Sequence, residues 1–277
     1  MDAIVIIAVS TMGGLGLFLA GALAIADRRL SVVEDPKIGK INEVLPNANC
    51  GACGNAGCYD FAVKLVEGKA APNGCPVGGK DVVDDISSIL GIDGGDAVIM
   101  RARVLCRGGK KEAAYKEARY SGPQNCAVQA LVSGGEKLCM YGCLGGGDCV
   151  TACQFNAMYM DENGLPVVID ELCTGCGLCV KACPRGIIEM HQQDRELFVI
   201  CKNQDDPKTS RKVCTVSCIG CQICARKSEG GVIMENNLAI IDYTKLDISK
   251  IPLDKCSTKA IDFIRTREAV TAGHENV

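Results

Sequence analysis

Closely spaced cysteines dominate this sequence and limit the folds open to it. Of its 277 residues 20 are Cys, and most of them stand in short-spaced groups. The chain has no Trp, five Phe and six Tyr, which argues against one large aromatic core. Small domains bury little apolar surface and often depend on metals or disulfides for stability. We therefore expect several small domains whose folds depend on the cysteines.

Three kinds of cysteine chemistry compete: disulfides, zinc sites and iron–sulfur clusters. Disulfides require an oxidising compartment, and structural zinc is usually held by paired C-x2-C motifs that a longer stretch separates. Here many cysteines form triplets with a more distant fourth partner, which is typical of iron–sulfur proteins. We interpret them as cluster ligands, with zinc as the main alternative because four thiolates also satisfy that ion.

A long apolar segment precedes the first cysteine. Residues 3–26 contain no charged side chain, and as a helix they would span about 36 Å, enough to cross a bilayer. Arg28 and Arg29 follow, so the positive-inside rule predicts a single-pass protein of the inner (cytoplasmic) membrane with its bulk on the cytoplasmic side. A cleaved signal peptide is the alternative, but the segment is too long and no basic residue precedes it.

The first cysteine group has the spacing C-x2-C-x4-C-x16-C. Glycines between the first three cysteines give that loop conformational freedom, and residues 59–67 have the pattern of a helix that leads toward the fourth. We expect this group to bind cluster 1 through Cys50, Cys53, Cys58 and Cys75.

The middle group contains the C-x2-C-x2-C-x3-C-P run of bacterial two-cluster ferredoxins, residues 173–184, preceded by four further cysteines. In that arrangement the fourth cysteine of each run binds the other cluster. The expected ligands of cluster 2 are Cys139, Cys143, Cys149 and Cys183. The expected ligands of cluster 3 are Cys153, Cys173, Cys176 and Cys179.

An internal repeat continues this pattern toward the C-terminus. When Cys143 is aligned with Cys218, the second copy has no cysteine at any of the four positions that correspond to the ligands of cluster 3. Those positions hold Ser228, Leu246, Ser249 and Pro252. A coordinated loss of this kind is what the loss of one whole cluster would produce. Cluster 4 remains, with the expected ligands Cys218, Cys221, Cys224 and Cys256, and with Cys214 as the reserve candidate for Cys221.

Sixteen ligands for four [4Fe–4S] clusters leave four of the 20 cysteines over. Cys106 and Cys201 end apolar, strand-like runs, and we expect them to be small buried hydrophobes. Cys214 is the reserve ligand, and the sequence suggests no role for Cys126.

The expected fold class is α+β: a transmembrane helix, a small 4Fe–4S domain and two ferredoxin-like ββ/α modules with pseudo-twofold symmetry, the second degenerate. The boundaries are a transmembrane helix at 1–26, a linker at 27–45, the 4Fe–4S domain at 46–80, a linker and first-repeat lead-in at 81–137, the two-cluster ferredoxin domain at 138–190, a second-repeat lead-in at 191–213, the degenerate one-cluster ferredoxin domain at 214–265 and a tail at 266–277.

Composition and motifs exclude several other functions. The net charge is −3 and aromatic residues are few, so we expect no nucleic-acid partner. We find no nucleotide-binding or hydrolase motif and predict no catalytic residue. A cubane whose four irons all carry thiolates transfers single electrons and offers no open site for bond chemistry. The chain is therefore expected to carry electrons.

The order of these motifs resembles one known family. The uncleaved N-terminal helix, residues 49–58 (NCGACGNAGC), residues 141–145 (YGCLG) and the ferredoxin run are similar to the B subunit of the Rnf complex. That complex is a membrane ferredoxin:NAD⁺ oxidoreductase that couples electron flow to Na⁺ or H⁺ translocation. The resemblance implies that the chain accepts electrons from reduced ferredoxin and passes them to the flavin- and NAD-binding C subunit and the integral membrane subunits.

Two other interpretations stay open at this point. The chain could be a membrane-anchored redox sensor or interaction protein, although it contains no recognisable output domain. It could also be the electron-transfer subunit of another membrane oxidoreductase, such as a hydrogenase. The extra ferredoxin-like copy, which has lost a cluster, departs from the simplest pattern of the resembled family.

Overall fold

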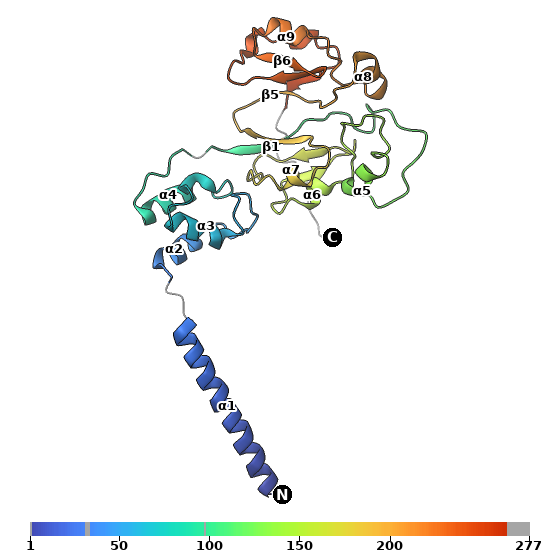
Figure 1. Ribbon diagram of the computed structural model, residues 1–277. Helices are drawn as coiled ribbons and strands as arrows, with labels where there is room; N and C mark the ends of the chain where they lie inside the picture. The colour runs from blue at the N-terminus through green and yellow to red at the C-terminus, as the bar shows by residue number, and fades with distance from the viewer. Residues whose placement is uncertain (1, 31–33, 97, 265–277) are drawn as a thin grey trace.

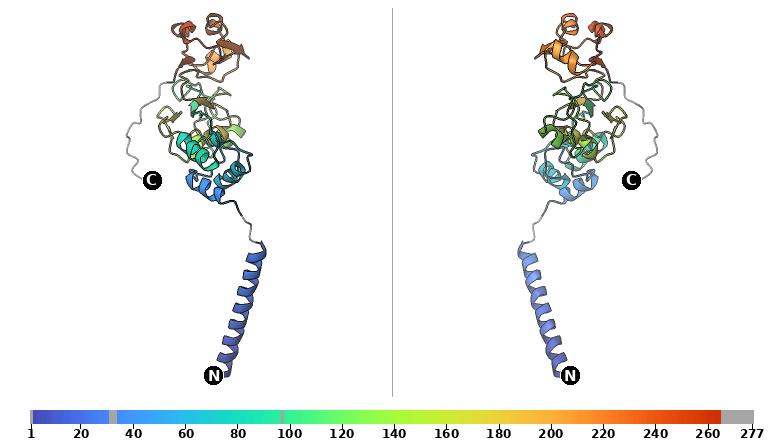
Figure 2. Two further views of the ribbon diagram at one scale, coloured as in Figure 1. Left: turned by 90° about the vertical axis from the view of Figure 1, so that its left-hand side faces the viewer. Right: turned by 90° about the vertical axis from the view of Figure 1, so that its right-hand side faces the viewer.

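The computed structural model describes residues 2–30, 34–96 and 98–264, and the tail expected at 266–277 lies outside them (Figure 1). One long helix, α1 (Asp2–Leu30), stands apart from the rest of the chain. The views in Figure 2 agree on the order that follows: a small helical domain, then a first and a second part that contain strands. The described chain is thus extended, with α1 at one end.

Helix α1 includes a segment, Val5–Arg29, that is long and apolar enough to cross a membrane. None of this segment is buried against other parts of the protein. Its large side chains are open on every side; Leu17, for example, is 78% exposed. A bilayer would cover such a surface, and Arg28 and Arg29 in the last turn would then lie at its edge.

Deleting residues 1–30 is expected to release the protein from the membrane without loss of cluster iron, because no described side chain of the deleted helix belongs to the apolar cores of the other domains. The measurement is the distribution of the protein between washed membranes and the soluble fraction, in cells without other subunits of a complex, together with iron per chain. Retention of the truncated protein in those membranes would mean that a second anchor exists.

The small helical domain contains α2 (Pro36–Val44), α3 (Cys58–Val66), η1 (Pro72–Gly74) and α4 (Gly79–Leu90). The Asp35 carboxylate accepts a hydrogen bond from Lys37 N, and Pro36 takes the first helical position, so α2 begins there. Ile41, Phe61 and Ile86 come from three different helices and are 0–2% exposed in one core. The domain therefore extends beyond the expected residues 46–80, because α2 and α4 supply two sides of its core.

The rest of the chain repeats one order of strands. The first repeat, residues 100–192, has β1 (Met100–Val104), β2 (Met158–Met160), β3 (Pro166–Val168) and β4 (Ile188–Gln192), with α5 (Cys126–Leu131), α6 (Asp148–Thr151) and α7 (Leu178–Ala182). The second repeat, residues 197–263, has β5 (Leu197–Val199), β6 (Val232–Glu235), β7 (Leu238–Ile241) and β8 (Ile261–Phe263), with α8 (Pro207–Val213), α9 (Ile223–Lys227), η2 (Ile248–Lys250) and η3 (Leu253–Lys255).

In each repeat the outer strands pair with each other and the inner strands form a hairpin. β1 pairs antiparallel with β4 and β2 with β3, just as β5 pairs with β8 and β6 with β7. The first strand of each repeat lies outside the expected modules 138–190 and 214–265. These strands lie in the expected lead-ins at 81–137 and 191–213, and sheet pairing joins them to residues far along the chain. The coarse expectation, an apolar N-terminal helix followed by mixed helix and strand, is confirmed.

A buried ion pair holds the first repeat together. Arg103, 4% exposed, lies in β1 and pairs with Asp170, 13% exposed, just before Cys173. The Arg103 guanidinium also lies 5.9 Å from the centre of the Phe198 ring, in the second repeat. The pair therefore links β1, the loop that carries Cys173 and the junction of the repeats.

Asp170→Ala is expected to destabilise the protein by about 3–5 kcal/mol, because it leaves the buried Arg103 charge without its partner. Anaerobic denaturant unfolding would measure the change. Asp194→Ala is the matched control, since Asp194 is exposed and such surface changes stay within about 0.5 kcal/mol. Equal midpoints for the two variants would contradict this role of the ion pair.

Candidate metal centres

All 20 cysteines lie in the described residues, and all carry free thiols. Within the described ranges, no three Cys, His, Asp or Glu side chains converge closely enough to hold a single metal ion. Groups of four cysteines instead border pockets that each contain about 330–370 Å³ of space free of protein atoms, part of it open to solvent. Four thiols around a pocket are the donor set that a [4Fe–4S] core requires.

The first pocket belongs to the small helical domain and is bordered by Cys50, Cys53, Cys58 and Cys75. Its loop is held by Asn49, whose Oδ1 accepts a hydrogen bond from Cys58 N at 2.9 Å. A side chain on Gly57 would come within 2.7 Å of that same oxygen. Helix α3 then begins at Cys58, so the loop and the helix together set three of the four thiols. The structure brings together the four cysteines expected for cluster 1.

The second pocket lies in the first repeat and differs by one residue from the expected set. It is bordered by Cys126, Cys143, Cys149 and Cys183. Cys139, expected here, lines a different pocket. Cys126 takes the place of Cys139 because its backbone packs directly against Gly146. A Cβ added to Gly146 would lie only 2.6 Å from Cys126 N, so Cys126 already fills the space beside this glycine. In the second repeat the position of Gly146 is taken by Cys221.

The start of α5 fixes Cys126 in this position. Asp148 accepts hydrogen bonds from Cys126 N at 2.7 Å and from Ala127 N at 3.1 Å. Asn125 caps the same helix by accepting a hydrogen bond from Val128 N at 2.8 Å. The sequence signal for Cys126 was weak. It consisted only of the glycine at position 146, where the second repeat has the ligand Cys221, which indicates that a cysteine from elsewhere in the chain is needed.

The expected ligands of cluster 3 also lie together. Burial is the main reason that the pKa of Cys179 rises to about 12, and the nearby thiols of Cys173, Cys176 and Cys153 raise it further. Cys149, from the neighbouring group, acts in the same direction. Cys153 therefore reaches the group of the ferredoxin run, as expected for crossed ligands.

The fourth pocket lies in the second repeat and is bordered by Cys218, Cys221, Cys224 and Cys256. Cys221 thus lies in this pocket, whereas Cys214 lines another. At the positions where the second repeat lacks ligands, protein fills the space. The buried Ser228 hydroxyl accepts a hydrogen bond from Val232 N at 2.8 Å, and Leu246 packs against the apolar core that contains Ile251.

Burial determines the protonation of these thiols when no metal is bound. It raises the pKa of Cys143 to about 12 and the pKa of Cys149 to about 11. Both are therefore protonated thiols at neutral pH. Iron binds thiolates, so loading of a cluster releases these protons.

The remaining cysteines, Cys106, Cys139, Cys201 and Cys214, line one further pocket. Cys106 and Cys201 were expected to be small buried hydrophobes, whereas Cys139 was an expected ligand of cluster 2 and Cys214 the reserve ligand of cluster 4. The sequence did hold a signal: Cys106 matches Cys201 in the internal repeat, and Cys139 matches Cys214.

Two of the cysteine-rich regions match known protein families. A family model described as a putative Fe-S cluster matches residues 45–77. A second model, described as a 4Fe-4S dicluster domain, matches residues 141–188. These matches support iron–sulfur cofactors in the helical domain and in the first repeat.

Curated relatives align with nearly the whole chain. The B subunit of the Na(+)-translocating ferredoxin:NAD(+) oxidoreductase complex of Acetobacterium woodii is 40% identical over 93% of this chain and 77% of its own length. The B subunit of the ion-translocating oxidoreductase complex of Methanosarcina acetivorans is 37% identical over 95% of this chain and 99% of its own length. The B subunit of the proton-translocating ferredoxin:NAD(+) oxidoreductase complex of Clostridium ljungdahlii is 36% identical, with coverages of 94% and 92%.

Proposed function

The chain belongs to the family of B subunits of Rnf-type ion-translocating oxidoreductase complexes, and from this we propose that it accepts electrons from reduced ferredoxin and passes them toward NAD⁺ reduction and ion pumping. It is a membrane-associated iron–sulfur electron-transfer subunit of an oxidoreductase. The relatives differ in the ion that their names give, so the proposal leaves the coupling ion open.

The proposed cofactors are four [4Fe–4S] clusters in two ferredoxin-like modules and the helical domain. Cluster 2 takes Cys126 in place of Cys139, and the other three keep their expected ligands. The proposed ligand sets are Cys50, Cys53, Cys58 and Cys75; Cys126, Cys143, Cys149 and Cys183; Cys153, Cys173, Cys176 and Cys179; and Cys218, Cys221, Cys224 and Cys256.

The observation that carries this proposal is the proximity of neighbouring cysteine groups. Cys50 of the helical domain lies near enough to Cys176 of the first repeat to raise the pKa of that thiol, although burial is the larger cause. In the same way, Cys149 of the second pocket lies near enough to Cys179 of the ferredoxin run to raise the pKa of the Cys179 thiol, again with burial as the larger cause. Clusters held by these cysteines would lie side by side, so electrons could pass from one domain to the next.

The proposed partners lie at the two ends of this path. Helix α1 anchors the helical domain near the integral membrane subunits, and the second repeat lies at the far end of the described chain (Figure 2). Arg28 and Arg29 support an orientation in which the clusters face the cytoplasm. Reduced ferredoxin and the flavin- and NAD-binding C subunit are the proposed electron donor and acceptor on that side.

The test is rapid anaerobic mixing of the full-length, cluster-loaded chain in detergent with reduced ferredoxin. We expect bleaching of the cluster absorbance within the time of a functional turnover. Dithionite gives the total reducible absorbance in the same sample. Reduction by dithionite but not by ferredoxin would overturn the proposed donor.

A further inference from the structure

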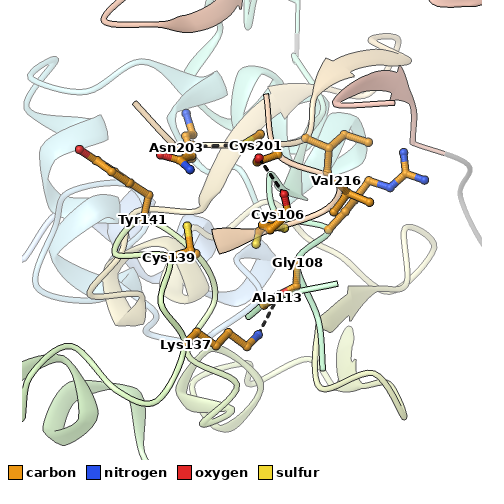
Figure 3. Close-up of a pocket in the computed structure, with 15 residues that line it drawn as sticks. Cys106, Gly108, Ala113, Lys137, Cys139, Tyr141, Cys201, Asn203 and Val216 are labelled. Carbon is orange, nitrogen blue, oxygen red and sulfur yellow. Dashed lines mark hydrogen bonds between the residues drawn. The ribbon is translucent and has the colours of Figure 1, made fainter. Parts of the chain in front are cut away.

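A pocket at the junction of the two repeats collects the four cysteines that the proposed function does not use. Figure 3 shows Cys106, Cys139 and Cys201 around this pocket, and Cys214 completes the set. It contains about 370 Å³ of space free of protein atoms, part of it open to solvent, as does the pocket of Cys218, Cys221, Cys224 and Cys256. Its size and donor set therefore equal those of a proposed cluster site.

The thiols approach one another around two glycines. A Cβ added to Gly108 would lie 3.0 Å from Cys214 Sγ and 3.9 Å from Cys106 Sγ. A Cβ added to Gly142 would lie 3.4 Å from Cys139 Sγ and 3.9 Å from Cys106 Sγ. Cys106 thus lies between the other two, and the glycines leave room beside the sulfur atoms.

The pocket is also pseudo-symmetric, with one pair of cysteines from each repeat. Cys106 follows β1, and its Sγ accepts a hydrogen bond from Cys143 N at 3.4 Å. Cys201 follows β5, and its Sγ accepts one from Cys218 N at 3.3 Å. Each donor belongs to a cysteine of an adjacent cluster site. The pocket therefore contacts cluster 2 on one side and cluster 4 on the other.

The charge around the pocket suits an anionic occupant. Lys137 is 6% exposed, lines the pocket and donates a hydrogen bond to Gly108 O at 2.8 Å. No acidic side chain lines the pocket, and no carboxylate of the described residues pairs with Lys137. A buried ammonium without a counter-charge is costly. Four neutral thiols would not offset that cost, whereas a cubane with four thiolates, at about −2, would.

A second polar group lacks a partner at the same place. Asn203 is 1% exposed and lines the pocket. Its Oδ1 accepts a hydrogen bond from Asp205 N at 2.8 Å, but its Nδ2 has no partner among the described residues. Buried amide groups are normally hydrogen-bonded. A cluster sulfur in the pocket would give this N–H group an acceptor.

From these observations we propose that Cys106, Cys139, Cys201 and Cys214 bind a fifth [4Fe–4S] cluster that joins the two repeats. It accepts one electron from a reduced neighbouring cluster and gives one to the next, so its own charge is restored after each transfer. The electrons come from the donor of the whole chain, and no bond is made or broken. With this cluster the proposed path continues from the helical domain through both repeats.

The first test is iron and acid-labile sulfide per chain in the anaerobically purified, full-length protein. Five clusters give about 20 of each, and four give about 16. The double variant Cys106→Ala/Cys201→Ala is expected to lose about four irons. Wild-type protein with about 16 irons, with or without one zinc, would overturn the fifth cluster, and so would an unchanged iron content in the double variant.

The second test keeps the four thiols and changes the charge. Lys137→Gln is expected to retain all the iron and to lower the reduction potential of one cluster, because the cation stabilises the extra electron. Redox titration followed by electron paramagnetic resonance would measure the shift. Lys245→Gln is the control, since Lys245 is 68% exposed on the second repeat. Unchanged potentials in Lys137→Gln would overturn the proposal.

These tests separate the fifth cluster from the general function. Reduction of the double variant by ferredoxin, with about four irons missing, would support both the fifth cluster and the electron-transfer role. A wild-type chain that ferredoxin reduces while it holds only about 16 irons would keep the role and overturn the fifth cluster.

Discussion

Replacing Cys176 with Ala is expected to remove about four irons per chain and to slow electron passage between the helical domain and the repeats. Metal sites lose roughly 10–100-fold in activity even when only an outer-shell partner is removed, so loss of a direct ligand should cost at least as much. The readouts are iron content and the rate at which reduced ferredoxin bleaches the remaining clusters.

The size of this effect follows from the position of Cys176. It belongs to the ferredoxin run, and its thiol interacts with Cys153 of its own group and with Cys50 of the helical domain. Cluster 3 is thus the proposed link between the helical domain and the first repeat. Its loss would leave cluster 1 without its nearest neighbour, even if every other cluster stayed loaded.

Ser249→Ala is the matched control, because Ser249 aligns with Cys176 in the second repeat, where no cluster 3 equivalent is expected. The Ser249 hydroxyl is exposed and only bonds Asp247. This variant should keep its full iron content and rate. A Cys176→Ala protein that also keeps both would show that Cys176 is not a cluster ligand.

The sequence predicts those features that depend on local spacing. The N-terminal helix follows from one uninterrupted apolar run, and helix α3 lies within one residue of its expected range 59–67. The grouping of Cys50, Cys53 and Cys58 needs only a short loop, so spacing alone is informative. Even the crossing of Cys153 to another group could be expected, because a known ligand pattern fixes it.

The features that the sequence could not supply depend on contacts between distant segments. Cys126 stands far before Cys143, and the packing of its backbone against Gly146, together with the hydrogen bond from Cys126 N to Asp148, brings it into the second pocket. The pairing of β1 could not be predicted for the same reason: β1 is a short strand whose partner, β4, lies beyond the whole cysteine group. The spacing of residues in the sequence does not predict contacts between segments so far apart in the chain.

The sequence predicts that Cys106 and Cys201 are small buried hydrophobes, and the proposed fifth cluster instead makes them ligands. Each ends an apolar run, as a core residue would, and neither has another cysteine close in sequence. Only the approach of one repeat to the other brings them together with Cys139 and Cys214. The internal repeat shows that Cys106 corresponds to Cys201 and Cys139 to Cys214. It does not show how close the two repeats lie in space.

Replacing Gly146 with Ala is expected to displace Cys126 and so to remove about four irons from cluster 2. The added Cβ would lie 2.6 Å from Cys126 N and 2.8 Å from the Asn125 carbonyl carbon, both backbone atoms. Asp148 holds that backbone through its hydrogen bond to Cys126 N, so it cannot shift at low cost. Overpacking of this kind typically costs about 1–3 kcal/mol.

Gly39→Ala provides the control for this prediction. Gly39 lies in α2, and an added Cβ there meets nothing within 4 Å; Ala at such a helical position adds roughly 1 kcal/mol of stability. Its iron content should stay unchanged, whereas Cys126→Ala should lose the same irons as Gly146→Ala. If Gly146→Ala and Cys126→Ala both kept their full iron, Cys139 would regain its place as the fourth ligand of cluster 2. The proposed fifth cluster would then lack a ligand as well, because one thiolate cannot complete both sites.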